Sequence, residues 1–217
     1  MYRIISKAIL IVCHFTSLIF AINVYSQDKI ANLKLEKNTI YIFSRGTQTK
    51  SGIIAEKFNS HDRKITHVGI GFWEHNDIRI YHVVDIDSSQ TALVITDLKS
   101  FINESVYYLS IWKCDNNTID FKNLKKICKR YSSKKIYFDF SFNLNDGNTL
   151  YCSEFCATVL NETNSDIFNF KPKVMQLDTF YKTVLERDEL LYYPVDFFED
   201  DNCFTKIYES DFSFTTD

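Results

Sequence analysis

The chain has 217 residues and a formal net charge of −3; 16% of its residues are aromatic, and it contains only five glycines and two prolines. This composition excludes a disordered or linker-rich protein, and no basic patch with interleaved aromatic residues indicates a nucleic-acid partner. The length suits one domain with a hydrophobic core.

The first 26 residues have the pattern of a secretory signal peptide. Arg3 and Lys7 precede a long apolar run, and the small residue Ser26 follows it. A membrane anchor is the alternative, but polar residues interrupt the run and no basic stop-transfer cluster follows. We therefore expect export to the periplasm or the extracellular space, with no stable membrane span after cleavage. One domain would remain, residues 27–217. Its formal charge would be −5, because cleavage removes the two positive charges of Arg3 and Lys7 from a chain of charge −3.

Strands and helices are predicted along the whole of that domain. Stretches rich in β-branched and aromatic residues predict strands at 39–45, 66–73, 78–86, 91–96 and 106–114, and a last edge strand at 204–210. Apolar residues at helical spacing predict helices at 51–59, 97–104, 118–133, 152–162 and 178–187. Asp97 and Asp178 are the expected N-caps of two of them. The order predicts an α+β domain, with a central antiparallel sheet packed against helices.

Two cysteines lie four residues apart in the stretch TLYCSEFCATVL. Cys152 opens a predicted helix, where unpaired backbone N–H groups carry partial positive charge and can lower the pKa of a thiol. Cys156 lies one turn deeper among apolar residues, which is the setting of a small buried side chain. The five cysteines beyond the signal peptide are an odd number, so at least one thiol of an exported chain is unpaired.

Two other interpretations of the cysteine pair remain. A disulfide between Cys152 and Cys156 is allowed by distance, since residues i and i+4 of a helix lie roughly 6 Å apart at Cα. A metal site would need further thiol or imidazole ligands at short spacing, and the nearest histidine in the sequence is His82.

Four histidines follow the signal peptide. His61 and His75 lie in polar loops, where a solvated side chain is expected. His67 and His82 lie in two predicted strands joined by the turn-like EHND, which makes them near neighbours across the strands. Two imidazoles in a sheet need polar partners, so they form either a structural pair or the base and orienting group of a thiol site.

The order of the segments THVGI and LYCSEF resembles the permuted papain-like hydrolases of the NlpC superfamily, over roughly residues 38–165. The nearest branch is the YiiX/YebB-like group. There an "hVGI" strand carries the base histidine and a "YCSEL" helix start carries the nucleophile. The resemblance therefore implies Cys152 as nucleophile and His67 as general base. Asp139, in FDF, matches an aspartate common before the cysteine motif, and we expect it to support a turn or cap a helix.

The third catalytic position departs from that group. Its members usually carry a glutamate in a strand that reads like VYEA, whereas IYHV puts His82 there. A His–His–Cys set is similar to the related lecithin–retinol acyltransferase branch and to several NlpC peptidases. A neutral His82 can accept from the far N–H of His67 and so orient it.

The resemblance implies two-step acyl transfer. Cys152 attacks an amide or ester carbonyl, its backbone N–H helps to hold the oxyanion, and His67 protonates the leaving group. We expect an exported cysteine amidase or peptidase that acts on peptide or acyl-amide substrates, with peptidoglycan fragments as the natural class outside the membrane. The alternatives are a lipid-directed thiol acyltransferase or esterase, and an inactive binding domain of the same fold. No cofactor is implied.

Overall fold

The computed structural model describes residues 33–49, 55–103, 105–115, 119–144 and 146–212. The chain divides into two units, Met1–Glu36 and Lys37–Asp217. The predicted signal peptide, residues 1–26, lies outside the described residues. Among the residues that are described, no helix is both long and apolar enough to cross a membrane.

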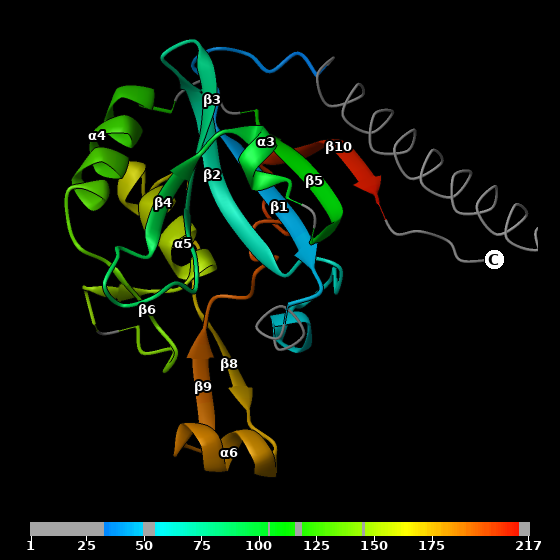
Figure 1. Ribbon diagram of the computed structural model, residues 1–217, viewed down its shortest axis with the longest axis vertical. Helices are drawn as coiled ribbons and strands as arrows, with labels where there is room; N and C mark the ends of the chain where they lie inside the picture. The colour runs from blue at the N-terminus through cyan, green and yellow to red at the C-terminus, as the bar shows by residue number, and fades with distance from the viewer. Residues whose placement is uncertain (1–32, 50–54, 104, 116–118, 145, 213–217) are drawn as a thin grey trace, which may run out of the picture. The chain divides into compact units, whose positions relative to one another are not determined.

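A six-stranded sheet forms the centre of the second unit (Figure 1). Every neighbouring pair of strands in it is antiparallel, and the strand order is β10-β5-β1-β2-β3-β4. The strands are β1 (Tyr41–Thr47), β2 (His67–Glu74), β3 (Asp77–Val83), β4 (Leu93–Thr96), β5 (Val106–Cys114) and β10 (Phe204–Asp211). The predicted α+β class is confirmed, and so is the edge strand at the end of the chain.

Helices cover both faces of the sheet. On one face α5 (Cys152–Thr163) packs against β2 and β3, and α4 (Phe121–Ser132) packs against α5. On the other face the short α3 (Leu98–Phe101) places Phe101 against the ring of Phe43, 6.2 Å between centroids. Because side chains alternate along a strand, residues two apart on β2 face the same helix layer.

The β2–β3 hairpin is confirmed with a tight turn. Glu74 and Asp77 are the last paired residues, so His75 and Asn76 alone connect the strands. Both have positive φ, 51° and 66°, which is the backbone twist that two-residue hairpin turns require. The turn fixes the register of the strands that carry His67 and His82.

A second hairpin was not predicted. It consists of β8 (Lys173–Gln176) and β9 (Glu189–Tyr192), with α6 (Thr179–Leu185) between them, and we call residues 173–192 the arm. Figure 1 shows the arm extending from the end of the sheet. Its two strands have four residues each, which is too short for periodicity to separate them from loop. The predicted cap Asp178 accepts from the backbone N–H of Tyr181 at 3.0 Å.

Smaller elements complete the unit. β6 (Tyr137–Phe138) and β7 (Thr149–Leu150) form a short parallel pair just before α5. Of the predicted helix 51–59, residues 55–58 are helical and residues 51–54 lie outside the described part of the chain. Asp139 is buried and accepts from the backbone N–H groups of Ser141 and Asn143, at 2.8 and 2.5 Å, so its predicted role in a turn is confirmed.

Candidate active site

His67 and His82 form a hydrogen-bonded pair on β2 and β3. His67 Nε2 lies 2.8 Å from His82 Nδ1, and the rings meet at 76°. Gly69 makes this possible, because a Cβ at that position would lie 2.9 Å from the Cβ of His82. The predicted proximity of the two histidines is therefore confirmed, and it depends on a glycine between them.

The pair is held by Thr96 at the His82 end and by the Phe101 ring beside both imidazoles. His82 Nε2 lies 3.1 Å from the hydroxyl oxygen of Thr96 on β4. The ring of Phe101 contacts both imidazoles, with centroids 5.9 Å from His67 and 5.1 Å from His82. His82 is 3% exposed. Thr96 and Phe101 together fix both rings. Because the Thr96 hydroxyl can donate or accept, it satisfies His82 Nε2 in either tautomer of the histidine pair.

Burial keeps both imidazoles neutral. It lowers the pKa of His82 to about 3, with a smaller contribution from Arg45. Burial also lowers the pKa of His67 well below its ordinary value of 6.5, and the positive charge of Arg45 and the electrostatic interaction with His82 act in the same direction. His67 is thus unprotonated at neutral pH, which is the form that a general base needs.

Cys152 begins α5, as predicted. Tyr151 is the N-cap in extended conformation, and its backbone N–H donates to Glu154 Oε2 in the first turn at 3.4 Å. The thiol is buried, and burial raises its pKa above the ordinary value of 9.0. Backbone N–H groups of Val68, Ser153 and Cys152 itself act in the opposite direction, as does the charge of Arg45. The expected lowering by the helix start is present but is outweighed by desolvation, so the resting group is a thiol.

Arg45 is a residue that the sequence interpretation did not single out. It lies near the end of β1, directly opposite His67 in the strand register. Its guanidinium lies 4.6 Å from the centre of the Phe101 ring and donates to the Phe101 carbonyl. Its Nε is buried with no partner among the described residues. Burial lowers the pKa of Arg45 to about 10, so it still carries its charge at neutral pH. In the sequence, the signal that could have pointed to Arg45 was a single arginine at the end of the mostly apolar predicted strand TIYIFSR.

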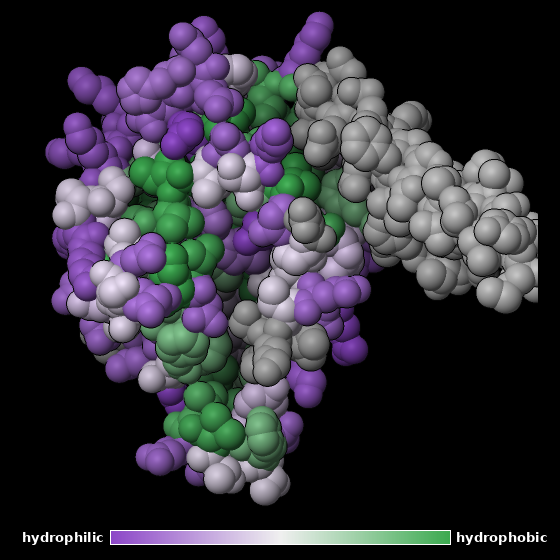
Figure 2. Space-filling model, viewed as in Figure 1, coloured by the Kyte–Doolittle hydropathy of each residue, from purple (hydrophilic) through white to green (hydrophobic). Residues whose placement is uncertain are grey.

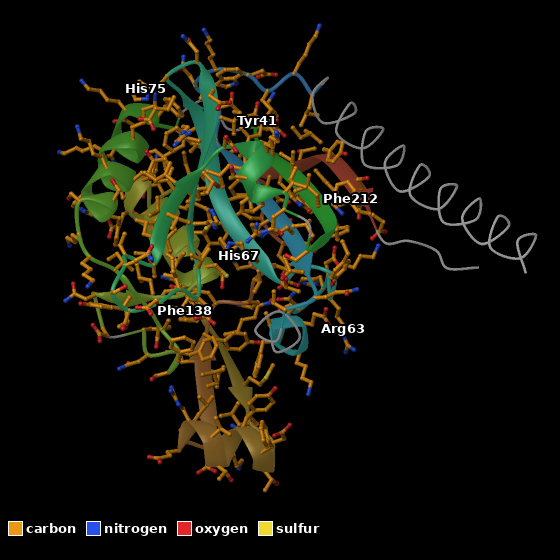
Figure 3. All side chains as sticks on the ribbon, viewed as in Figure 1. Tyr41, Arg63, His67, His75, Phe138 and Phe212 are labelled. Atoms are coloured by element: carbon orange, nitrogen blue, oxygen red, sulfur yellow. The ribbon has the colours of Figure 1, made fainter. Side chains whose placement is uncertain are left out.

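The three groups line one cavity of about 360 Å³, whose walls include Arg45, His67 and Cys152. Figure 3 labels His67, on β2, and Phe138, on β6, and both belong to this lining. In the described part of the chain, no hydrogen bond joins the Cys152 thiol to the His67 ring; the Val68 N–H next to His67 reaches the sulfur instead. Catalytic contacts are often long before substrate binds.

Most of the cavity wall is apolar. The lining contributed by the arm and the neighbouring segments includes Phe58, Phe138, Phe142, Tyr181, Leu190 and Tyr192. Several of these also form a small cluster of buried side chains around Tyr151, the residue before Cys152. The thiol therefore shares its cavity with many aromatic side chains, a lining that suits an apolar ligand group.

The remaining predicted positions lie outside this arrangement. Cys156 is fully buried in the main core, as predicted, and forms no disulfide with Cys152. His61 and His75 are exposed, and His61 pairs with Asp200 at 2.8 Å. Within the described ranges, no group of three or more His, Cys, Asp or Glu side chains is placed to hold a metal ion.

Comparison with known proteins identifies the fold. No family model matches the chain, and no curated protein matches it. Among solved structures, the fold is similar to that of the metalloprotein YiiX from Escherichia coli O157:H7, with a TM-score of 0.60 and 14% sequence identity. The match covers 81% of this chain and 99% of that one. At this identity the likeness concerns the fold.

Proposed function

We propose that this chain is a permuted papain-like thiol acyl hydrolase or acyltransferase, with Cys152 as nucleophile, His67 as general base and His82 as the group that orients His67. The observation that carries the proposal is the 2.8 Å hydrogen bond between His82 and His67, because His67 lines the same cavity as Cys152. A nucleophile and a base on one cavity, with an orienting group behind the base, are the parts that thiol catalysis requires.

The resting site contains a neutral thiol and a neutral imidazole rather than an ion pair. If His67 Nε2–H donates to His82 Nδ1, the Nδ1 of His67 is left unprotonated and can accept the thiol proton. His82 then keeps its own proton on Nε2, which donates to Thr96. A neutral His82 serves as the acceptor in this chain, in the place where the resembled group carries glutamate.

The reaction proceeds in two balanced steps. The Cys152 sulfur forms a bond to the substrate carbonyl carbon while His67 takes the thiol proton, giving a tetrahedral oxyanion. The carbonyl re-forms, the bond to the leaving group breaks, and His67 returns the proton to that group. Water or another acceptor, deprotonated by His67, then attacks the thioester and releases the acyl group and the thiol.

Arg45 supplies the positive charge of the site. The charge opposes ionisation of His67 and favours negative charge at Cys152. In the tetrahedral intermediate the negative charge is on oxygen beside the same sulfur, so Arg45 can stabilise it together with the Cys152 N–H.

The apolar cavity favours an apolar acyl group over a peptidoglycan peptide. Cell-wall peptides carry carboxylates and amides that would lose their hydration against aromatic walls. A fatty-acyl ester or amide would lose apolar surface from water instead, which is favourable. We therefore place the lipid-directed activity first and the peptide amidase second.

The test compares ester and amide substrates on the full chain. We expect p-nitrophenyl decanoate to be hydrolysed with a kcat/KM at least tenfold above p-nitrophenyl acetate, because the longer chain fills the cavity. Cys152→Ala should remove the activity, and His67→Ala should lower it by about a hundredfold or more. Cys128→Ala, which removes a buried thiol of α4, is the matched control and should retain activity.

Other outcomes decide between the alternatives. Release of amine from muropeptides without release of fatty acid would make the peptide amidase correct. Folded protein that hydrolyses neither class would identify an inactive binding domain. His82→Glu, which restores the residue of the resembled group, should stay active, whereas full activity in His82→Ala would remove His82 from the site.

A further inference from the structure

The arm exposes four large apolar side chains in two pairs. Val174 on β8 and Leu191 on β9 are direct partners in the hairpin register, and they are 62% and 46% exposed. Phe180 and Val184 lie one turn apart on α6 and are 67% and 59% exposed. Figure 2 shows apolar residues gathered over the arm.

The arm's own packing covers these side chains only in part: the Phe180 ring lies 5.3 Å from that of Tyr181, yet Phe180 remains 67% exposed. The inner side of α6 carries Tyr181, whose ring lies 5.2 Å from that of Phe58, and Leu185, which packs against the same cluster. Phe180 and Val184 project from a neighbouring side of the helix, and α6 contains no buried residue. An apolar surface of this kind on a soluble domain usually marks an interaction site.

The apolar surface continues from the arm to the thiol. Val184 and the 63% exposed Phe140 line the cavity that contains Cys152, so its outer wall is itself solvent-exposed and apolar. Tyr181 and Leu190 extend the lining inward. Exposed apolar side chains and Cys152 thus line the same cavity, whose wall also carries polar side chains such as Asn103 and Ser105.

The charge of the arm indicates which kind of surface it meets. The arm, residues 173–192, contains three basic and four acidic side chains, a net charge of −1: Lys173, Lys182, Arg187, Asp178, Glu186, Asp188 and Glu189. The whole chain is negative, at −3. An apolar arm with this slight negative charge on an acidic chain has no charge complement to an anionic lipid surface, whereas a zwitterionic surface carries no net charge that would repel it.

We propose that the arm docks on a zwitterionic lipid surface through Phe180, Val184, Val174 and Leu191, and that a lipid acyl chain enters the Cys152 cavity from there. The substrate part of this inference rests on the proposed function. A second copy of the chain is the competing occupant, but four side chains fall well short of the roughly 800 Å² per partner that a stable interface buries.

A local probe on the full chain tests the docking. Phe180→Trp in a Cys152→Ala background is mixed with phosphatidylcholine vesicles in which one acyl chain is brominated. We expect its fluorescence to be quenched at least twofold more than that of the Cys152→Ala parent. Ile207→Trp in the same background replaces a 37% exposed apolar residue on β10, away from the arm, and should show no added quenching. A probe at position 180 reports the arm itself, whatever other segment of the chain contacts lipid.

A polar variant provides the second measurement. Val174→Ser with Leu191→Ser, in the Phe180→Trp chain, should reduce the added quenching by about tenfold at equal lipid. The docking would be overturned by equal quenching at positions 180 and 207, by binding that requires phosphatidylglycerol, or by a stable dimer that the serine variants dissociate. Hydrolysis of soluble esters without added quenching would support the proposed function and overturn the docking. Added quenching without hydrolysis would support the docking and overturn the proposed function.

Discussion

At the scale of single residues, the site is built from neutral groups around one charge. His67 and His82 are both uncharged at neutral pH, Cys152 is a thiol, and Arg45 keeps its proton. A glutamate at position 82 would stabilise an imidazolium, which a neutral histidine does less well. Arg45 has the same effect as histidine in place of glutamate at position 82, because its charge also disfavours the protonated form of His67. The neutral His82 and the burial of the Cys152 thiol therefore favour proton transfer during the attack over a preformed thiolate–imidazolium pair.

This arrangement predicts an unusual pH dependence. The base form of His67 is lost only as pH falls through a pKa well below 6.5. We expect kcat/KM for ester hydrolysis to stay constant from pH 8 down to about pH 5.5, where a histidine of ordinary pKa would have lost most of its base form. The alkylation rate of Cys152 by iodoacetamide should still be rising at pH 9, because alkylation needs the thiolate. A pH–rate profile with half-activity near 6.5, or an alkylation plateau at neutral pH, would contradict it.

Arg45→Met provides the matching variant for the same measurement. Since Arg45 lowers the pKa of His67, its removal should raise that pKa and move the acid limb of kcat/KM to higher pH. The alkylation profile of Cys152 should also move to higher pH, because a charge that favours the thiolate is lost. Arg79→Met, on β3, which does not pair with β1, is the control and should leave both limbs in place.

At the scale of elements, the start of α5 combines a helix cap with a buried acid. Glu154 lies in the first turn and accepts from the Tyr151 N–H, which otherwise has no partner at a helix start. The residue is only 4% exposed, and burial raises its pKa to about 8. The carboxyl is therefore protonated in the folded chain over a range where it ionises in the unfolded chain.

Glu154→Gln should consequently change how stability depends on pH. A folded-state pKa above the unfolded value of 4.5 means that the native state is most favoured below pH 4.5 and loses stability as pH rises toward 8. Glutamine keeps the acceptor and removes the ionisation. We expect the variant to exceed the parent at pH 8 by about 2–4 kcal/mol and to match it near pH 4.5. Urea denaturation at both pH values measures the free energies of unfolding. An equal difference between variant and parent at the two pH values would refute the raised pKa of Glu154.

At the scale of the whole unit, the segment that follows the arm is fastened to the start of α5 and to the loop before β2. The backbone of Tyr193, which follows β9, accepts from the Ser153 hydroxyl and donates to the Tyr151 hydroxyl, at 2.8 and 2.7 Å. Asp196 is 1% exposed and accepts from the backbone N–H groups of Ser60, His61 and Asp62, in the loop that leads into β2. Segments more than 130 residues apart thereby position the same cavity.

The buried carboxylate of Asp196 should contribute strongly to stability. Asp196→Ala leaves three backbone donors without their acceptor, and we expect a loss of about 2–4 kcal/mol in the free energy of unfolding. Asp200→Ala is the matched control, because it removes a carboxylate paired with the same loop through the exposed His61 side chain. That pair should contribute less than about 1 kcal/mol. Comparable losses of unfolding free energy in the two variants, measured by urea denaturation, would contradict this role of Asp196.

The sequence predicted those elements whose signal is local. The β2–β3 hairpin, the caps Asp97 and Asp178 and the helix at Cys152 each depend on residues within one or two turns of chain. The arm strands escaped prediction because four residues carry too little periodicity. Arg45 escaped because its meaning depends on its register partner His67, which follows 22 positions later.

The sequence by itself determined the α+β class, the proximity of His67 and His82, and the place of Cys152 at a helix start. Each follows from periodicity, turn chemistry or spacing, which act over short stretches of chain. Only the tertiary structure decided the protonation of the site and its apolar approach. Both depend on how deeply groups are buried and on which distant segments meet, and the desolvation that raises the pKa of Cys152 against the helix start is absent from any local pattern.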